Sequence, residues 1–164
     1  MKRSLPRLTA VAALLLATAC TQRDPHAGHD HAPATPAQHA HQAPHGGTPV
    51  VLGHEAYHLE FVRDAATGKL SAYLLDGEME NFIRVATPSF EVVATVGGER
   101  RPLIFTAVAN PATGEKIGDT SLFETQADWL KTTPAFDATL TTLTIRGTPF
   151  AAVPFNFPKG NDHD

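Results

Sequence analysis

The chain has 164 residues, with 13 Lys and Arg against 17 Asp and Glu and a formal net charge of −4, a size typical of one domain. Apolar residues make up 42% of it, yet no stretch reaches the roughly 18 to 20 apolar residues of a membrane-spanning helix, which excludes a polytopic membrane protein. No run of Lys or Arg follows the N-terminus, so nucleic acid is not an expected partner. The single cysteine, Cys20, excludes an intramolecular disulfide and a cysteine-rich zinc site.

The N-terminus has the pattern of an export signal. Basic residues precede the apolar run 8–19, which has the length of a signal-peptide core and ends at Cys20. The sequence LATAC at 16–20 resembles a bacterial lipobox, whose cysteine is lipidated and becomes the mature N-terminus. We therefore expect a lipoprotein signal peptide over 1–19 and a lipid anchor at Cys20, with an ordinary signal peptide and an incidental cysteine as the alternative. By resemblance to lipoprotein sorting, the absence of Asp after the cysteine favours the outer over the inner membrane, with the protein facing the periplasm.

A segment without large apolar residues follows the cysteine. Residues 21–44 contain no Val, Ile, Leu, Met, Phe, Trp or Tyr and are rich in Ala, His and Pro. Such a segment cannot bury enough apolar area to offset its conformational entropy. We therefore predict that residues 20–47 form a disordered tether, that the folded domain spans 48–158, and that 159–164 form a disordered tail.

Six histidines occur in this tether, in the spacings HxxHxH and HxH. They are His26, His29, His31, His39, His41 and His45, the last of which is followed by two glycines. Neutral imidazole suits Zn, Cu, Ni and Co, whereas Ca and Mg prefer oxygen ligands. The pattern predicts capture of a divalent transition metal, with Zn or Cu foremost and Ni or Co as further candidates. The alternatives are a solvated low-complexity spacer and a pH-responsive linker that gains charge as its histidines protonate.

From residue 48 onward, apolar and polar residues alternate with a period of two. Turn residues interrupt this alternation at short intervals, including Gly68, Gly114 and the pair Gly97-Gly98, which are able to adopt positive φ. The segments predicted as strands are 49–52, 56–63, 69–75, 82–86, 89–96, 101–109, 138–146 and 150–157.

One segment departs from the strand pattern. Ser121 and Glu124 have the spacing of a helix capping box and precede residues 126–131, so we expect one short helix here. Many strands without strand–helix–strand alternation indicate an all-β fold. We expect an antiparallel immunoglobulin-like β-sandwich with one short helix, and a closed barrel is the alternative.

The domain carries its own candidate ligands. His58 and Glu60 lie two positions apart on the predicted strand 56–63, on the face opposite its apolar residues. We expect them to form half of a metal site that His45 completes as the chain enters the domain. The alternative is that His58 is a surface or half-buried histidine beside a carboxylate.

Three short motifs carry a resemblance to a known group. The sequences PHGG at 44–47, YHLE at 57–60 and YLLDG at 73–77 resemble small His-rich periplasmic lipoproteins of uncharacterised role that are associated with heavy metals. This resemblance covers about residues 44–157. The motif at 45–47 and the strands just after it are also faintly similar to the N-terminal segment of periplasmic adaptors of cation-efflux pumps, whose long hairpin and barrel domains this chain lacks.

Neither GxSxG nor GxxxxGK[ST] is present, and we do not expect an enzyme. The predicted function is metal binding by a membrane-anchored lipoprotein, for buffering, capture or hand-over to an efflux or other envelope protein. The alternative is a non-catalytic interaction module of the envelope, in which the His-rich segment is a spacer. In either case, the membrane is contacted through the lipid anchor only.

Overall fold

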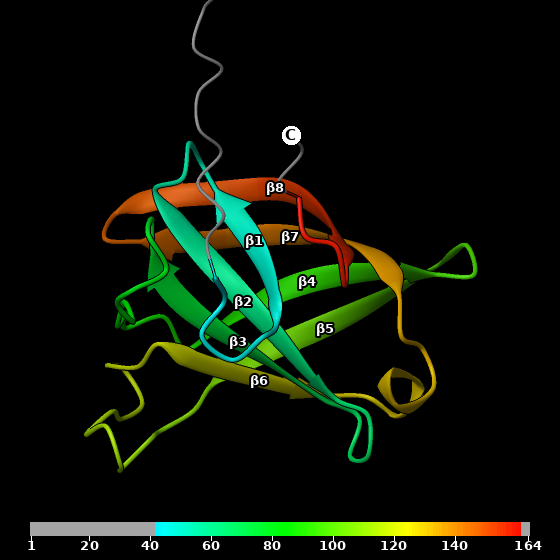
Figure 1. Ribbon diagram of the computed structural model, residues 1–164, viewed down its shortest axis with the longest axis horizontal. Helices are drawn as coiled ribbons and strands as arrows, with labels where there is room; N and C mark the ends of the chain where they lie inside the picture. Colours follow the sequence, from blue (N-terminus) through cyan, green and yellow to red (C-terminus); the bar gives the residue numbers. More distant parts are fainter. Residues whose placement is uncertain (1–41, 162–164) are drawn as a thin grey trace, which may run out of the picture. The chain divides into compact units, whose positions relative to one another are not determined.

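A computed structural model describes residues 42–161 of the chain (Figure 1). The strands are β1 (Thr48–Leu52), β2 (Tyr57–Asp64), β3 (Lys69–Asp76), β4 (Ser89–Val96), β5 (Glu99–Ala107), β6 (Leu122–Gln126), β7 (Phe136–Ile145) and β8 (Thr148–Phe157), and a single 3-10 turn, η1, spans Asp128–Lys131. Every strand pairing is antiparallel. The predicted all-β antiparallel class is confirmed.

The strands belong to one sheet with the order β1-β2-β3-β6-β5-β4-β7-β8. The sheet curls until its two edge strands, β1 and β8, contact each other, so that it is nearly closed (Figure 1). An immunoglobulin-like sandwich requires two separate sheets. That division is not confirmed, because the pairing is continuous through all eight strands, which is closer to the barrel alternative.

The core lies inside the curled sheet and follows from the period-two alternation. On β4, residues Phe90, Val92 and Ala94 are buried, and their neighbours in sequence are more exposed. Aromatic rings stack both between paired strands and between strands far apart in the chain: the ring centroids are 5.0 Å apart for Phe90 and Phe105 on β4 and β5, and also for Phe61 and Phe155 on β2 and β8. Burying side chains of this size contributes about 1.5–3 kcal/mol each. One apolar face therefore holds all eight strands together.

Most predicted strands agree with the structure, and two segments differ. Residues 82–86 form no strand, because only the single bridges Leu75–Phe82 and Val85–Thr120 pair them with the sheet. The capping-box residues Ser121 and Glu124 do not begin a helix: Ser121 directly precedes β6 and Glu124 lies within it. The helical turn is limited to η1.

The folded part extends beyond residues 48–158 at both ends. Residues 45–47 bind β2, as described below, although the sequence placed them in the tether. At the other end, Gly160 exchanges backbone hydrogen bonds with Asn156, and the Asn161 side chain bonds β1. Within residues 42–161, no helix has the length and apolarity needed to cross a membrane.

Candidate functional site

Strand β2 is buried on both of its faces, and this sets up the site. Leu59 and Phe61 point into the core, whereas His58 and Glu60 occupy the opposite face of the strand. The sequence predicted that opposite face correctly but not its burial, since His58 is 1% exposed and Glu60 0%. An ionisable side chain with no exposure requires hydrogen-bond partners.

The Glu60 carboxylate has three such partners. Oε1 accepts hydrogen bonds from the backbone N–H groups of His45 (2.8 Å) and Gly47 (2.9 Å). Oε2 lies 2.8 Å from Nδ1 of the His45 ring. One carboxylate therefore holds both the backbone and the side chain of His45 against the outer face of β2.

The sequence PHGG explains why the chain can take this path. The N–H of Gly46 bonds the carbonyl of Ala43 (3.0 Å) in a tight turn, and Gly46 has a φ of +66°, which favours glycine. At Gly47, an added Cβ would lie 2.6 Å from the carbonyl oxygen of Phe61. Glycine at 47 is thus the residue that lets the backbone approach β2 closely enough to reach Glu60.

The His45 ring is fixed from a second direction. Tyr73 stands directly opposite Glu60 on the neighbouring strand β3. The His45 ring stacks on Tyr73, with centroids 3.9 Å apart and planes 17° from parallel, and Phe82 lies tilted 5.8 Å away. The His45 side chain remains 37% exposed. It is thus held in place and still accessible from solvent.

The contact with Glu60 determines which nitrogen of His45 carries the proton. An ionised carboxylate can only accept a hydrogen bond, so Nδ1 must donate. In a neutral imidazole, the other nitrogen, Nε2, then holds the lone pair and is the atom able to bind a metal. Nδ1 of metal-binding histidines is often held by a carboxylate in this way.

A pocket of about 340 Å³ adjoins the His45 ring. Its aromatic side consists of His45, Tyr73 and Phe82, and its polar side consists of Arg84, Asn110, Thr113, Glu115 and Ser121, with Leu122 completing the wall. Phe82 is 46% exposed at this position. The pocket is large enough for a small ligand or a side chain, and one of its walls contains the His45 ring.

The polar side of the pocket is internally paired. Glu115 accepts hydrogen bonds from the N–H and hydroxyl of Ser121 (2.9 and 2.6 Å) and from the hydroxyl of Thr113 (2.9 Å). Burial raises the pKa of Glu115, but these hydrogen bonds, with Arg84 nearby, outweigh it and hold the pKa below its usual value. Arg84 in turn donates to the carbonyl of Thr113 (2.6 Å). This wall therefore presents an ionised carboxylate whose oxygens are already engaged.

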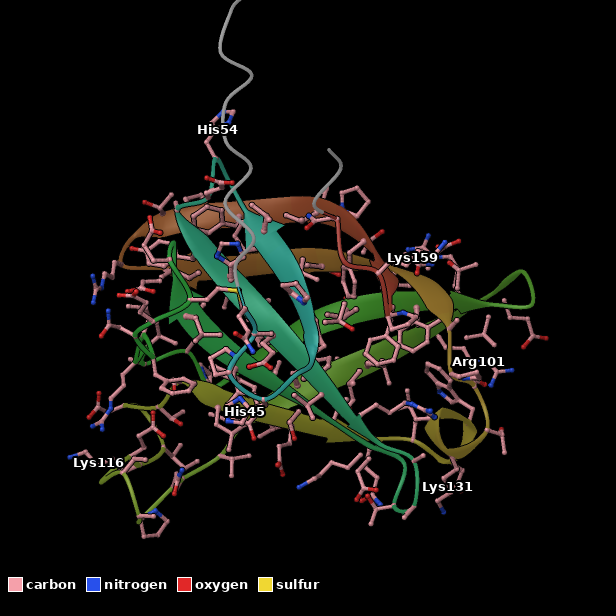
Figure 2. All side chains as sticks on the ribbon, viewed as in Figure 1. His45, His54, Arg101, Lys116, Lys131 and Lys159 are labelled. Carbon is pink, nitrogen blue, oxygen red and sulfur yellow. The ribbon has the colours of Figure 1, made fainter. Side chains whose placement is uncertain are left out.

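The other two histidines of the folded part differ from each other. His58 is buried, and its Nδ1 lies 3.3 Å from the carbonyl oxygen of Asp76. His54 is exposed in the turn between β1 and β2, and Figure 2 shows it well away from His45. The structure brings His45 and Glu60 into contact but, within residues 42–161, does not group them with His58 as the three-ligand set expected from the sequence.

Residues 54–58 spell His-Glu-Ala-Tyr-His, which matches the HExxH pattern of zinc-binding helices. That motif places both histidines on one face only when the segment is helical. Here residues 54–56 form a turn and β2 begins at Tyr57, so His54 is exposed and His58 buried. Residues 54–58 therefore do not form the metal-binding helix of that motif.

Across residues 42–161, no three His, Cys, Asp or Glu side chains are grouped closely enough to hold a metal ion. His45 is thus the one tether histidine whose geometry can be described. The predicted ligands His26, His29, His31, His39 and His41, and the predicted lipidation site Cys20, lie outside the described residues.

Sequence reasoning missed the pocket. Tyr73 and Phe82 fall in segments that the sequence predicts as strands, and Glu115 belongs to a loop without any motif. Only the cross-strand pairing of Tyr73 with Glu60 reveals the aromatic side, and no sequence signal indicates it. Comparison with protein-family models, curated proteins and solved structures gives no match for this chain.

Proposed function

We propose that this chain binds divalent transition metal ions, with Zn or Cu foremost and Ni or Co as further candidates, through His45 and the histidines that precede it. The observation that carries the proposal is the His45–Glu60 contact, in which Nδ1 faces a buried carboxylate 2.8 Å away. This leaves Nε2 as the ligand atom on a ring that is already oriented. His39 and His41 are close enough in sequence to bind the same ion.

The setting of this activity is part of the proposal. The charged start, the apolar run and the lipobox-like LATAC sequence support a lipoprotein held on a membrane through Cys20, with its body in the periplasm and the outer membrane preferred. Together with the resemblance to His-rich lipoproteins, this setting suits metal buffering, capture or hand-over to an efflux protein. The chain itself is proposed to be non-catalytic.

A second candidate function is that of an envelope interaction module. It is supported by Phe82, which is 46% exposed beside the pocket, because an exposed aromatic ring at a concave surface is a common anchor for a partner protein. In this function, the His-rich segment is a spacer, and the five histidines that precede His45 can be replaced without effect, whereas His45 is part of the pocket wall.

The two functions are separated by calorimetric titration of zinc and copper salts into the chain from Thr21 onward. Substitution is preferable to truncation, because a chain beginning at Thr48 would remove all three partners of the buried Glu60. Two variants are compared with the unsubstituted chain: His45→Ser alone, and Ser at the five preceding histidines. His54→Ser, in the exposed turn, is the matched control.

We expect micromolar or tighter binding that is weakened by each of the two variants and unchanged by His54→Ser. Unchanged binding in both variants would contradict the proposed site. Absence of binding in the unsubstituted chain would reject metal binding and favour the interaction module.

A further inference from the structure

We infer that Glu60 is the positioning residue of this metal site: it fixes His45 in the tautomer whose Nε2 binds the ion and is not itself a ligand. The inference rests on the proposed function and deepens it. It also revises the expectation that Glu60 contributes an oxygen directly to the metal.

The Glu60 carboxylate is already fully engaged with His45 and Gly47. Glu60 is 0% exposed, Oε1 is held by two backbone N–H groups and Oε2 faces the ring of His45. A metal ion could reach this fully buried carboxylate only if the residues that cover it, His45 among them, moved away. Such a movement would also leave the backbone N–H groups of His45 and Gly47 without their acceptor, which is unfavourable. The arrangement therefore favours Glu60 as a support for His45.

Both the backbone and the ring of His45 are held in a fixed orientation. Its backbone N–H and its ring both bond the same carboxylate, and its ring plane is set by the stack on Tyr73. A flexible histidine loses side-chain freedom when it binds an ion, which weakens binding. Much of that freedom is already lost at His45, so binding of an ion to its Nε2 meets less of this cost.

The contact with Glu60 also changes the chemistry of the His45 ring. A carboxylate on Nδ1 holds the proton there and makes Nε2 a better electron donor, and removing such a partner typically weakens metal binding about 10- to 100-fold. Neutral imidazole with a free Nε2 suits borderline ions such as Zn²⁺ and Cu²⁺. The same contact would do little for Ca²⁺ or Mg²⁺, which prefer oxygen.

Glu60→Gln tests this chemistry with little change in shape. The Gln carbonyl oxygen can still accept from the backbone N–H groups of His45 and Gly47. Its NH₂ group then faces Nδ1, which must accept instead of donate, so the ring proton moves to Nε2. The substitution thus changes the tautomer of His45 and blocks its ligand atom.

The first measurement is long-range ¹H–¹⁵N NMR of the histidine rings in the metal-free chain from Thr21 onward, at a pH where the rings are neutral. We expect His45 to carry its proton on Nδ1 in the wild type and on Nε2 in Glu60→Gln. A wild-type His45 protonated on Nε2 would overturn the inference, and this reading needs no variant to fold.

The second measurement is titration with zinc alone. We expect Glu60→Gln to bind zinc roughly 10- to 100-fold more weakly than the wild type. Glu91→Gln, a carboxylate on β4 that accepts from Thr141, is the matched control and should bind as the wild type does. Equal affinity of the wild type and Glu60→Gln would overturn the inference while leaving the proposed function standing. No zinc binding by the wild type would reject both, and the two failures are thereby distinguished.

Discussion

The Asn161 side chain forms the two hydrogen bonds with the Val51 backbone that a neighbouring strand would otherwise form. Its Oδ1 accepts from the Val51 N–H (2.7 Å) and its Nδ2 donates to the Val51 carbonyl (3.1 Å), across a separation of 110 residues in the chain. Val51 lies on β1, whose outer edge would otherwise present unpaired backbone groups. A single carboxamide thus joins the two ends of the curled sheet.

Replacing Asn161 with Ala should therefore loosen this junction. We expect the free energy of unfolding to fall by about 1–2 kcal/mol, the net contribution of two hydrogen bonds, as measured by urea denaturation. The Val51 amide should also exchange its hydrogen faster. Lys159→Ala, an exposed neighbour, is the control and should change neither quantity. An Asn161→Ala protein with wild-type stability would show that the bond between β1 and Asn161 contributes nothing to closure.

The sequence was most informative where one face of a strand is buried and turns bound both ends. The predicted strand 89–96 coincides with β4, because its alternation is clean and Gly97-Gly98 ends it. The sequence does not predict β6, because this strand is short and has one fully buried residue, Phe123. The spacing of Ser121 and Glu124 also matches that of a helix capping box. Residues 82–86 do alternate, with Ile83 and Val85 buried, but they form only isolated bridges. Alternation of apolar and polar residues therefore predicts which side chains are buried, but it does not predict whether the segment pairs with another strand.

The site was predictable in part. The sequence predicts that His45 meets His58 and Glu60 as metal ligands; in the structure, Nδ1 of His45 lies 2.8 Å from Oε2 of Glu60, and no three-ligand group occurs within residues 42–161. The sequence did not indicate that Glu60 would be fully buried, because an outer strand face normally meets solvent. The residues that approach it, 45–47, were assigned to the tether, and no pattern in one sequence shows that a chain will fold back over its own strand.

Gly47 should be the least replaceable glycine of the turn that holds His45. In Gly47→Ala, the new Cβ would meet the Phe61 carbonyl oxygen at 2.6 Å, so the backbone must move away from β2 and its bond to Glu60 must weaken. Gly98→Ala is the control, since its Cβ would meet nothing within 4 Å and only its φ of +85° is unfavourable for Ala.

We expect the control to lose about 1–2 kcal/mol of stability and Gly47→Ala to lose clearly more, as measured by urea denaturation. Gly47→Ala should also shift the backbone amide resonance of His45. If the two substitutions cost the same, the close approach at Gly47 is not required.

The lowered pKa of Glu115 predicts a specific loss of stability in acid. Because the pKa is lower in the folded than in the unfolded protein, the stabilisation is fully present above the unfolded value and is lost as pH falls through the folded value. We expect Glu115→Gln to reduce stability by about 2 kcal/mol near neutral pH, since it weakens the charge-assisted bonds from Ser121 and Thr113. Below the folded pKa, the difference from the wild type should shrink.

Urea denaturation at about pH 7 and about pH 3 provides this comparison. Glu99→Gln is the control, because that exposed carboxylate pairs only with Arg101 at the surface and should change stability little at either pH. A stability difference for Glu115→Gln that is equal at both pH values would show that the ionised form of Glu115 is not what stabilises the loop.

The aromatic ring of Tyr73, and not its hydroxyl, should strengthen metal binding, because it is the ring that stacks on His45. Tyr73→Phe keeps the ring that lies 3.9 Å from His45, whereas Tyr73→Ala removes it and leaves the imidazole with Glu60 and the tilted ring of Phe82. Aromatic pairs contribute about 0.5–1.5 kcal/mol beyond their buried area, which corresponds to roughly a 2- to 12-fold change in affinity if that energy orients the ligand. We therefore expect zinc titration to give near wild-type affinity for Tyr73→Phe and weakening in that range for Tyr73→Ala. Equal zinc affinity of the two variants would show that Glu60 orients His45 without help from the stack.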